Sequence, residues 1–543
     1  MEEDEDENFT INEDAVEIDI AIVPPHEANG VSSDEDSDEE DVPQCNLNHI
    51  GRGCLTTECE VFGLTERSST SSSKPEKIQW TKRAFHSPSF PATSNNLNSE
   101  AEELLSICCD PIDFFNILFP DSLIHTIVNE SNHYASEKGK SINLTSDELM
   151  KVIGILYLSG YSTVPQRRLY WSSENDTRNE LVATSMPRTR FENILSILHF
   201  NHIEDKNERA FKIRPLMDAV NKSFKEFIPP SDEYSIDKSM IKYFGRHPAK
   251  QCLRSKPIRF GFKMWTLCSF TGACHRFELY LGAFSFPKSP DGLGASVVLE
   301  LSKDLSQGST LYFDNYFTGI SLLQKFSEKN VKATGTISRT RLRGAEKILS
   351  DVKEINKKDR GYSEAVSTDK VNVIQWKDKK TVCLASNFHS EAPLNQCRRF
   401  STAKKKHVSV SQPNIVKCYN SGMGGVDLLD EMINAYRISI RTKKWYWCIF
   451  TWILDLVCVN AWFLYRRMNE DYMPFLKFKR SITLALLSEN VRHHPRQIRP
   501  QRNSETMADC DSAVKFANPT LCTGAVCVTF PFTQNVLNSS NFR

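Results

Sequence analysis

The apolar residues between positions 101 and 227 recur at spacings of three and four, which is the period of a helix with one buried face. Thr145 or Ser146 can cap the fourth of the expected helices, with Glu148 in its first turn. The pattern predicts an all-helical block that ends near residue 230. Helices are expected over residues 101–109, 111–118, 121–137, 146–158 and 188–200, with one or two more within 209–227.

After residue 231 the apolar residues switch to runs rich in aromatic and β-branched side chains, which are typical of strands. The order is three strands, a helix, a strand, a helix and a strand. This order predicts an α+β fold with a mixed sheet of the ribonuclease-H-like type. The strands are expected over residues 235–241, 259–270, 275–283, 310–313 and 331–337, and the helices over 294–305 and 320–330.

The remaining regions show weaker patterns. Residues 1–100 contain acidic runs and a Ser-rich stretch that cannot bury enough apolar surface to offset chain entropy, so we expect disorder there. Residues 344–414 are charged, with short strand-like pieces, and indicate an insertion. The chain is helical again from 424 to about 490, and the last 50 residues have little periodicity.

One apolar run allows two interpretations. Residues 445–465 are mostly apolar and are flanked by pairs of basic residues, as in a membrane span. However, Asp455 lies at the centre of this run, where membrane insertion costs roughly 2.5–3.5 kcal/mol, and Asn460 adds a further penalty. We interpret the run as a buried helix of a large protein, and we expect no membrane partner.

The charge is unevenly distributed. Residues 1–51 hold 18 of the 68 acidic residues and no Lys or Arg, which leaves 50 acidic against 67 basic residues in the rest, a formal charge of +17. An acidic tail on a basic body is typical of nucleic-acid proteins, although other soluble proteins share it. None of the 16 cysteines forms a CxxC pair, and the first 20 residues are acidic. These features favour a reduced, intracellular chain without a signal peptide.

Three aspartates occupy distinct local settings. Asp237 lies in a strand-like run, Asp314 ends another, and Asp427 opens a helical run just after a Gly-Gly pair. Asp430 follows three positions later, on the same helix face. Carboxylates that converge in this way could hold Mg²⁺, which prefers oxygen ligands. The alternative is that Asp427 only starts a helix and Asp314 only forms a turn.

Basic residues with interleaved aromatics form a second signal. They could hold DNA phosphates close to a metal site, or they could simply form a solvated basic face. A separate pattern, Arg398-Arg399 followed by 404–406, resembles a two-part nuclear import signal. The candidate DNA-binding residues are Arg246, Lys250, Arg254, Lys256, Arg259, Lys263, Arg441, Lys443 and Lys444.

Several of these residues belong to longer motifs. They are residues 235–237, 243–247, 256–263, 313–318, 423–427, 429–430 and 441–446, together with the helical stretch Met186-Pro187-Arg188. At these motifs the chain resembles the piggyBac family of DNA transposases and their domesticated relatives, over roughly residues 105–490.

The resemblance implies a catalytic site in which Asp237, Asp314 and Asp427 bind two Mg²⁺ ions, with Mn²⁺ as a substitute. Asp430 matches a fourth acidic metal-site residue. It also implies a nuclear, homodimeric protein that cleaves and joins double-stranded DNA at transposon ends and TTAA-type targets. Lys238 departs from the family pattern, because some relatives have an acid there.

The C-terminal region also departs from the family. Cys510, Cys522 and Cys527 lack the paired spacing of the zinc module that many members use to read transposon ends. The alternative function is therefore a domesticated nuclear DNA-binding protein that no longer transposes.

The resemblance also assigns roles to the regions of the chain. A helical DNA-binding and dimerisation domain spans 101–230 and 441–495. A catalytic domain spans 231–343 and 415–440, with an insertion at 344–414. Tails occupy 1–100 and 496–543.

Overall fold

The structure is a computed structural model. It describes residues 19–22, 59–62, 78–93, 97–202, 208–253, 258–282, 286, 289–402, 404–469 and 472–488. Most of the predicted acidic tail lies outside these residues. So do Arg254, Lys256 and the three C-terminal cysteines.

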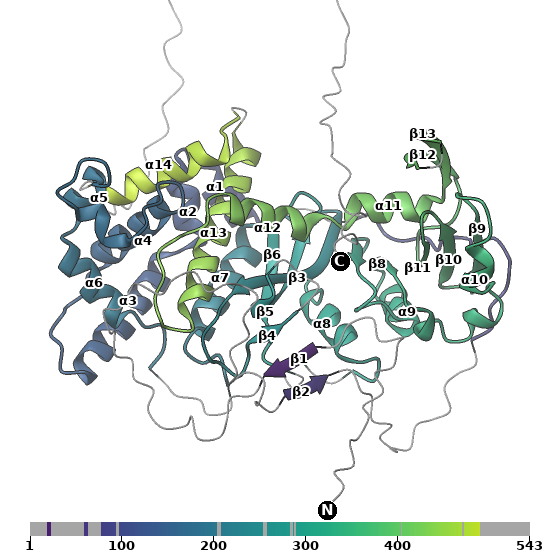
Figure 1. The fold of residues 1–543 in the computed structure, drawn as a ribbon, viewed down its shortest axis with the longest axis horizontal. Coiled ribbons are helices and arrows are strands. Elements are labelled where there is room, and N and C mark those ends of the chain that lie inside the picture. The colour runs from purple at the N-terminus through teal and green to yellow at the C-terminus, as the bar shows by residue number, and fades with distance from the viewer. Residues whose placement is uncertain are drawn as a thin grey trace, which may run out of the picture. The chain divides into compact units, whose positions relative to one another are not determined.

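Helices from both ends of the described chain build one helical block. In Figure 1, α13 and α14 lie among α1 to α4, and α13 contacts α2 while α14 contacts α4. All five helices predicted between 101 and 200 are confirmed, and the Thr145–Glu148 pair forms a reciprocal capping box. The helices of the block are α1 Ser99–Ser106, α2 Pro111–Leu118, α3 Asp121–Glu137, α4 Ser146–Ser159, α5 Glu180–Ser185, α6 Arg188–Ile197, α7 Arg214–Phe227, α13 Trp447–Met468 and α14 Phe475–Leu487.

The long apolar helix α13 lies at the centre of this block. By length and composition it could cross a membrane, yet 89% of its most apolar window is buried inside the structure. Its two polar residues have partners: Asp455 accepts from Lys479 Nζ at 2.7 Å, and the Asn460 amide exchanges two hydrogen bonds with the backbone of Cys274. The interpretation of a buried helix is confirmed, because protein groups satisfy both polar side chains.

The mixed sheet predicted after residue 231 is also confirmed. Strand β3 pairs antiparallel with β5 and parallel with β7, β7 pairs parallel with β8, and β6 pairs antiparallel with β5. Helix α8 (Leu293–Leu301) contacts β5 and β6, and α9 (Ile320–Glu328) contacts β8. The strands are β3 Glu233–Lys242, β4 Gln251–Cys252, β5 Phe260–Ser269, β6 Cys274–Leu279, β7 Thr310–Phe313 and β8 Lys332–Thr336.

The sheet separates two apolar cores, because side chains alternate between its faces. Ile236 and Phe313 face a core shared with α8 and α9. Ile241, Phe262 and Cys268 face the core of the helical block, which includes α12 (Gly425–Ala435) and α13. This second face therefore joins the sheet to helices that come from both ends of the described chain.

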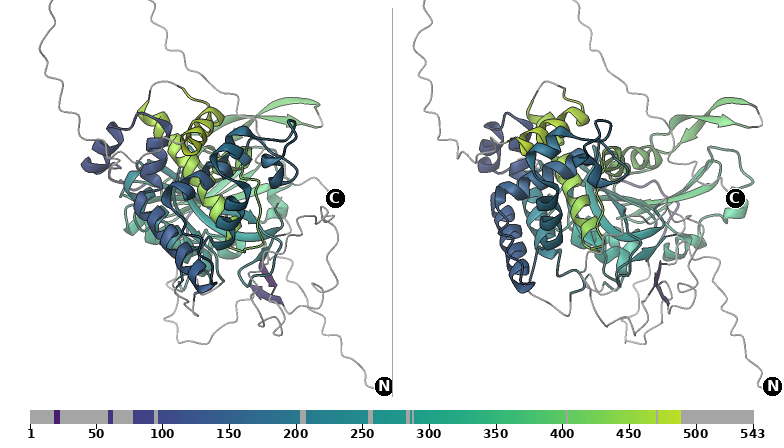
Figure 2. Two further views of the ribbon diagram at one scale, coloured as in Figure 1. Left: turned by 90° about the vertical axis from the view of Figure 1, so that its left-hand side faces the viewer. Right: turned by 60° about the vertical axis from the view of Figure 1, so that its left-hand side comes forward.

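The segment expected to be an insertion continues the same sheet. Strand β11 (Thr381–Ser386) pairs antiparallel with β8, and β10 (Asn372–Lys377) and β9 (Ser363–Ser367) follow at the edge. Only β12 (Asn395–Ser401) and β13 (Lys406–Gln412) form a separate two-stranded ribbon, which extends from this part of the fold in Figure 1 and in both views of Figure 2. Long-range pairing of this kind leaves no local signal in the sequence.

Part of the predicted disordered tail is placed on the body of the protein. Trp80 is 7% exposed, and its indole donates to the carbonyl of Arg343 at 3.1 Å. Thr81 forms a bridge with Ser367 at the edge of the sheet. Strands β1 (Asp19–Ile22) and β2 (Cys59–Phe62) also pair with each other, and β1 pairs with β4. The prediction of disorder up to residue 100 is therefore wrong for residues 78–93, because one buried tryptophan anchors them.

Candidate active site

The structure brings Asp237 and Asp314 side by side. Strands β3 and β7 are parallel neighbours in which Ile236 pairs with Phe313, and each aspartate is the next residue of its strand. Residues in matching register of parallel strands point to the same face of a sheet. Both aspartates are partly exposed, so their carboxylates share one edge of the sheet that solvent reaches.

Asp314 also organises the turn that follows it. Its Oδ1 accepts from the backbone N–H of Tyr316 at 2.9 Å, and its carbonyl accepts from the Thr318 hydroxyl at 2.8 Å. Asp314 therefore does form a turn, as the alternative interpretation of this residue proposed. The same residue therefore holds the turn and lies beside Asp237 in the register of the two strands.

Helix α12 carries the third aspartate to this region. The helix packs on β3 and β5, and Asp427 is exposed in its first turn. Two glycines permit the approach: a Cβ on Gly422 would lie 2.1 Å from the ring of Tyr312, and one on Gly425 would lie 2.2 Å from the Ser269 carbonyl oxygen. Neither position has room for a side chain, so the start of α12 lies directly against the sheet.

The three aspartates converge around Tyr419. This tyrosine lies in α11 (Asn414–Gly422), and burial raises the pKa of its phenol well above the usual value. The negative charges of Asp314, Asp237 and Asp427 each raise that pKa further, while a hydrogen bond with Thr336 lowers it. One phenol therefore lies within the electrostatic reach of all three carboxylates. The sequence analysis missed Tyr419, because no motif marks it.

Asp430 lies toward β5. Burial raises the pKa of the Cys268 thiol, its contacts with Cys274 raise it further, and the charge of Asp430 adds to the rise. Cys268 is fully buried on β5. Asp430 is therefore close to Asp427 in the sequence. Its charge, however, acts on Cys268, a buried thiol of β5.

The donor chemistry of the site fits a hard divalent cation. Carboxylate oxygens are the ligands that Mg²⁺ prefers, and like charges that face one another are costly without a cation. Within the described residues, however, no three His, Cys, Asp or Glu side chains meet at metal-binding geometry. The carboxylates lie at one edge of the sheet, and they would have to move closer together to form a complete set of metal ligands.

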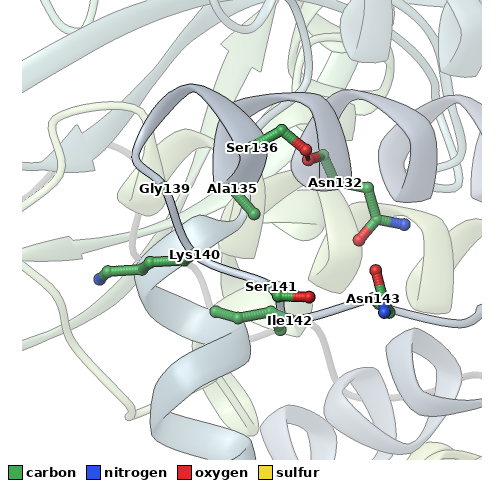
Figure 3. A pocket seen from close by; sticks show the side chains of 8 residues that line it. All are labelled: Asn132, Ala135, Ser136, Gly139, Lys140, Ser141, Ile142 and Asn143. Atoms are coloured by element: carbon green, nitrogen blue, oxygen red, sulfur yellow. Dashed lines mark hydrogen bonds between the residues drawn. The ribbon is translucent and has the colours of Figure 1, made fainter.

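The two prominent pockets of the described chain lie elsewhere. One, of about 250 Å³, lies between the C-terminal end of α3 and residues 140–143 (Figure 3). Its Asn132 is occupied by two hydrogen bonds to the backbone of Leu144. The other lies between Gly160 and Arg480. Neither contains an aspartate, so the aspartates lie outside both of these pockets.

Four of the predicted DNA-binding residues are exposed: Arg246, Arg259, Arg441 and Lys443. The basic residues next to His247 and those next to Trp445 are far apart in the sequence but meet in the structure. The ring of His247 packs on that of Trp445, with centroids 4.2 Å apart. Lys250 is partly buried, and its Nζ donates to the carbonyl of Gly245 at 2.9 Å. Exposed basic side chains from both groups therefore flank one aromatic contact.

The prediction that Lys263 contacts DNA is wrong. Its side chain is fully buried, with Nζ 4.4 Å from the ring centroid of Trp265 and 5.2 Å from that of Tyr316. Lys238 is 6% exposed, and its Nζ lies 5.7 Å from the same Tyr316 ring. Aromatic faces stabilise a desolvated ammonium group. The apolar residues on both sides of Lys263 in β5 were the signal for a buried strand.

Lys444, which was also predicted to contact DNA, is partly buried against the helical block. Its ammonium group donates to the carbonyls of Leu195, Ser196 and Leu198 at 3.0, 2.7 and 3.4 Å. These carbonyls lie at the C-terminal end of α6, where a cation satisfies unpaired acceptors and the helix dipole. Lys444 therefore stabilises the helical block.

Neighbouring lysines provide a matched test of this assignment. We expect Lys444→Met to lower the free energy of unfolding by about 1.5–3 kcal/mol, since hydrogen bonds from a charged group are lost. Its DNA affinity should stay unchanged. Lys443→Met should lower stability by less than Lys444→Met, because Lys443 is exposed, and should reduce the salt dependence of DNA binding by about one unit of slope. Urea unfolding and fluorescence anisotropy over a salt series measure both quantities, and the reverse pattern would refute the assignment.

The adjacent glycines before Asp427 offer a second matched pair. A Cβ on Gly425 would collide with the Ser269 carbonyl, whereas a Cβ on Gly424 would meet nothing within 4 Å. Gly425→Ala should cost about 1–3 kcal/mol of stability and displace Asp427. A displacement of about 1 Å lowers activity on the order of a hundredfold. Gly424→Ala should change neither. Equal behaviour of the two variants in unfolding and nicking assays would contradict this role of the glycine.

Comparisons with known proteins agree on one relationship. A family model described as Transposase IS4 matches residues 110–462. The human PiggyBac transposable element-derived protein 3 is 37% identical over 422 residues, which is 76% of this chain and 71% of that protein. The human PiggyBac transposable element-derived protein 2 is 34% identical over 495 residues, which is 87% of this chain and 82% of that protein.

A solved structure shares the fold. A chain in the cryo-EM structure of a piggyBac transposase synaptic complex with hairpin DNA matches with a TM-score of 0.60 and 21% identity. The match covers 73% of this chain and 83% of the solved one. It extends over both the helical block and the sheet, since either part alone is shorter than the matched length.

Proposed function

Since this chain belongs to the piggyBac family of transposases and transposable-element-derived proteins, we propose that it cleaves and joins DNA strands with an aspartate triad. The observation that supports this function is the convergence of Asp237, Asp314 and Asp427 around Tyr419. Strand order supports a ribonuclease-H-like catalytic domain: β6, β5, β3, β7 and β8 lie side by side, with β5 antiparallel to β3. The substrates are transposon ends and TTAA-type targets.

In this proposal the aspartates hold two Mg²⁺ ions. Asp237 and Asp314 supply carboxylates from neighbouring strands, and Asp427 supplies one from α12. Such ions, when bound, stabilise the attacking and leaving oxygens of a phosphodiester displacement. The N-terminal end of α12 adds partial positive charge that favours a nearby phosphate. Tyr419 is protonated at neutral pH like an ordinary tyrosine, and burial raises its pKa further, so its phenol is a hydrogen-bond donor beside the carboxylates.

The exposed basic residues around the His247–Trp445 contact orient the DNA. Arg246, Arg259 and Lys443 supply phosphate contacts that position the duplex without reading its sequence. All three aspartates are at least partly exposed and lie away from the two prominent pockets, which agrees with a duplex substrate. We further propose that the helical block binds transposon ends and forms a homodimer, and that the protein acts in the nucleus. Light scattering and imaging of a tagged chain test the last two points.

The alternative function is a DNA-binding protein derived from a transposase that no longer transposes. The observation that favours it is that no closed set of metal ligands is present in the described residues. Such a protein needs the basic surface and does not need the carboxylates. DNA binding without any metal-dependent cleavage is its expected behaviour.

The deciding experiment measures duplex binding by fluorescence anisotropy and nicking of supercoiled plasmid with Mn²⁺. Binding together with Mn²⁺-dependent nicking supports a transposase. Binding without nicking, on plasmids with and without candidate transposon ends, favours the derived DNA-binding protein. A chain that does not bind DNA at physiological salt overturns both functions.

A further inference from the structure

The ribbon of β12 and β13 carries a concentrated positive charge. Residues 395–412 contain five Lys and Arg residues, one His and no Asp or Glu. The two strands pair only with each other, and in Figures 1 and 2 they extend from the part of the fold that holds β9 to β11. Arg399 binds a carboxylate of the body, whereas Arg398 and the three lysines of the ribbon are exposed.

The inner face of the ribbon is anchored to the body. Val410 is 4% exposed and belongs to a small apolar core with Trp376. The Trp376 indole donates to the carbonyl of Ser411 at 2.9 Å. Arg399 donates to Asp378 at 3.1 Å, and Arg360 also binds that carboxylate. These contacts hold the arm in a defined position, so little entropy is lost when it binds a partner.

The outer face and the tip are exposed. Arg398 and Phe400 project from β12 on the face opposite to Arg399, because side chains alternate along a strand. Phe400 is 55% exposed and packs edge-on against His407, its partner in register. The exposed lysines at the tip are Lys404, Lys405 and Lys406. Phe400 therefore presents an exposed aromatic ring on the same face of the ribbon as Arg398.

We propose that this ribbon is a second DNA-binding element, which enters the major groove of duplex DNA. The inference rests on the proposed DNA-binding function and adds a contact outside the aspartate site and its basic surroundings. The major groove is about 12 Å wide and admits a two-stranded ribbon. The tip lysines contact the phosphates along the groove, and Arg398 and Phe400 face the base edges.

This assignment differs from the import signal suggested by the sequence. Arg399 binds Asp378 on the inner face, so one of the basic residues of that pattern is not available to a receptor. The paired strands also hold Arg398 and Lys406 in a fixed ribbon. Duplex RNA is a poor alternative, because its deep and narrow major groove excludes side chains.

The test compares two double variants of the full chain with wild type. Lys404→Ala/Lys406→Ala removes two tip charges, and Lys353→Ala/Lys357→Ala removes two exposed charges at the short helix α10 (Val352–Ile355), outside the helical block. Binding to a 30-base-pair DNA duplex and to an RNA duplex of the same length is measured by anisotropy over a salt series. Circular dichroism melting checks that each variant folds.

The tip variant should reduce the salt slope for DNA by about 1.8 and weaken binding at 0.1 M salt by roughly 10- to 100-fold. The α10 variant should match wild type, and RNA binding should not depend on the tip. Phe400→Ser should change preference among DNA sequences without changing the salt slope.

Two results would overturn the ribbon assignment alone: equal slopes for the tip variant and wild type, or an equal loss on RNA and DNA. A wild-type chain that binds no DNA would overturn the proposed function itself, and the ribbon proposal with it.

Discussion

Asp314→Asn is expected to abolish metal-dependent nicking while leaving DNA affinity within about twofold of wild type. The change removes a negative charge from the pair that Asp314 forms with Asp237 on neighbouring parallel strands. It keeps the side-chain oxygen that accepts from the Tyr316 amide, so the turn is preserved. Loss of a cation at this site removes several kcal/mol of transition-state stabilisation, which corresponds to a rate lower by about a thousandfold or more.

The assay compares the rate of plasmid nicking with Mn²⁺ for wild type, Asp314→Asn and Asp369→Asn, all purified identically. Asp369 is exposed in a turn near the edge strand β9, so its substitution should leave the nicking rate unchanged. Equal nicking by all three proteins would show that another site or a contaminant cleaves the DNA. A parallel loss in Asp237→Asn would support a shared site, since the two carboxylates act as a pair.

The second large effect is expected from the buried ion pair of the helical block. Asp455→Ala should lower the free energy of unfolding by about 3–5 kcal/mol, because it leaves the Lys479 ammonium buried without its counter-ion. Asp455 is 2% exposed and Lys479 is 1% exposed. Asp455 also accepts from the Ile438 amide at 3.1 Å, so that donor would lose its partner as well. Equilibrium unfolding in urea measures the change.

A double variant tests whether the loss comes from the unpaired charge. Asp455→Leu/Lys479→Met removes both charges and fills the space with apolar groups, which is often neutral for a buried pair. The Ile438 amide and the Tyr436 carbonyl would still lose their partners. We therefore expect a remaining loss of about 1–2 kcal/mol. If the double variant is as unstable as Asp455→Ala, the charge is not the cause and the explanation fails.

Local periodicity predicted most of the fold. The helices before residue 200 follow from burial of one face, which repeats every 3.6 residues, and the five strands after 231 follow from runs rich in aromatic and β-branched residues. The polar Asp455 and Asn460 identified the 445–465 run as a buried helix. Periodicity could not show that β9 to β11 extend the sheet, because strand pairing depends on partners far along the chain.

Some roles of individual side chains could also be predicted from the sequence, and others could not. The register of β3 and β7 places Asp237 beside Asp314, as the two strand ends suggested. Sequence alone could not show that Lys443 is exposed while Lys444 is partly buried against the end of α6. Both are lysines in one basic run, and only the position of another helix makes them different.

The sequence by itself determined the order of the elements, the helical and mixed-sheet regions and the settings of the three aspartates. These properties depend on residues close together in the chain. Only the tertiary structure decided that Tyr419 lies among the carboxylates, that Lys263 is buried under aromatic rings and that Trp80 anchors part of the N-terminal region. These properties depend on packing between distant segments, for which a linear pattern of hydrophobic and charged residues carries no direct signal.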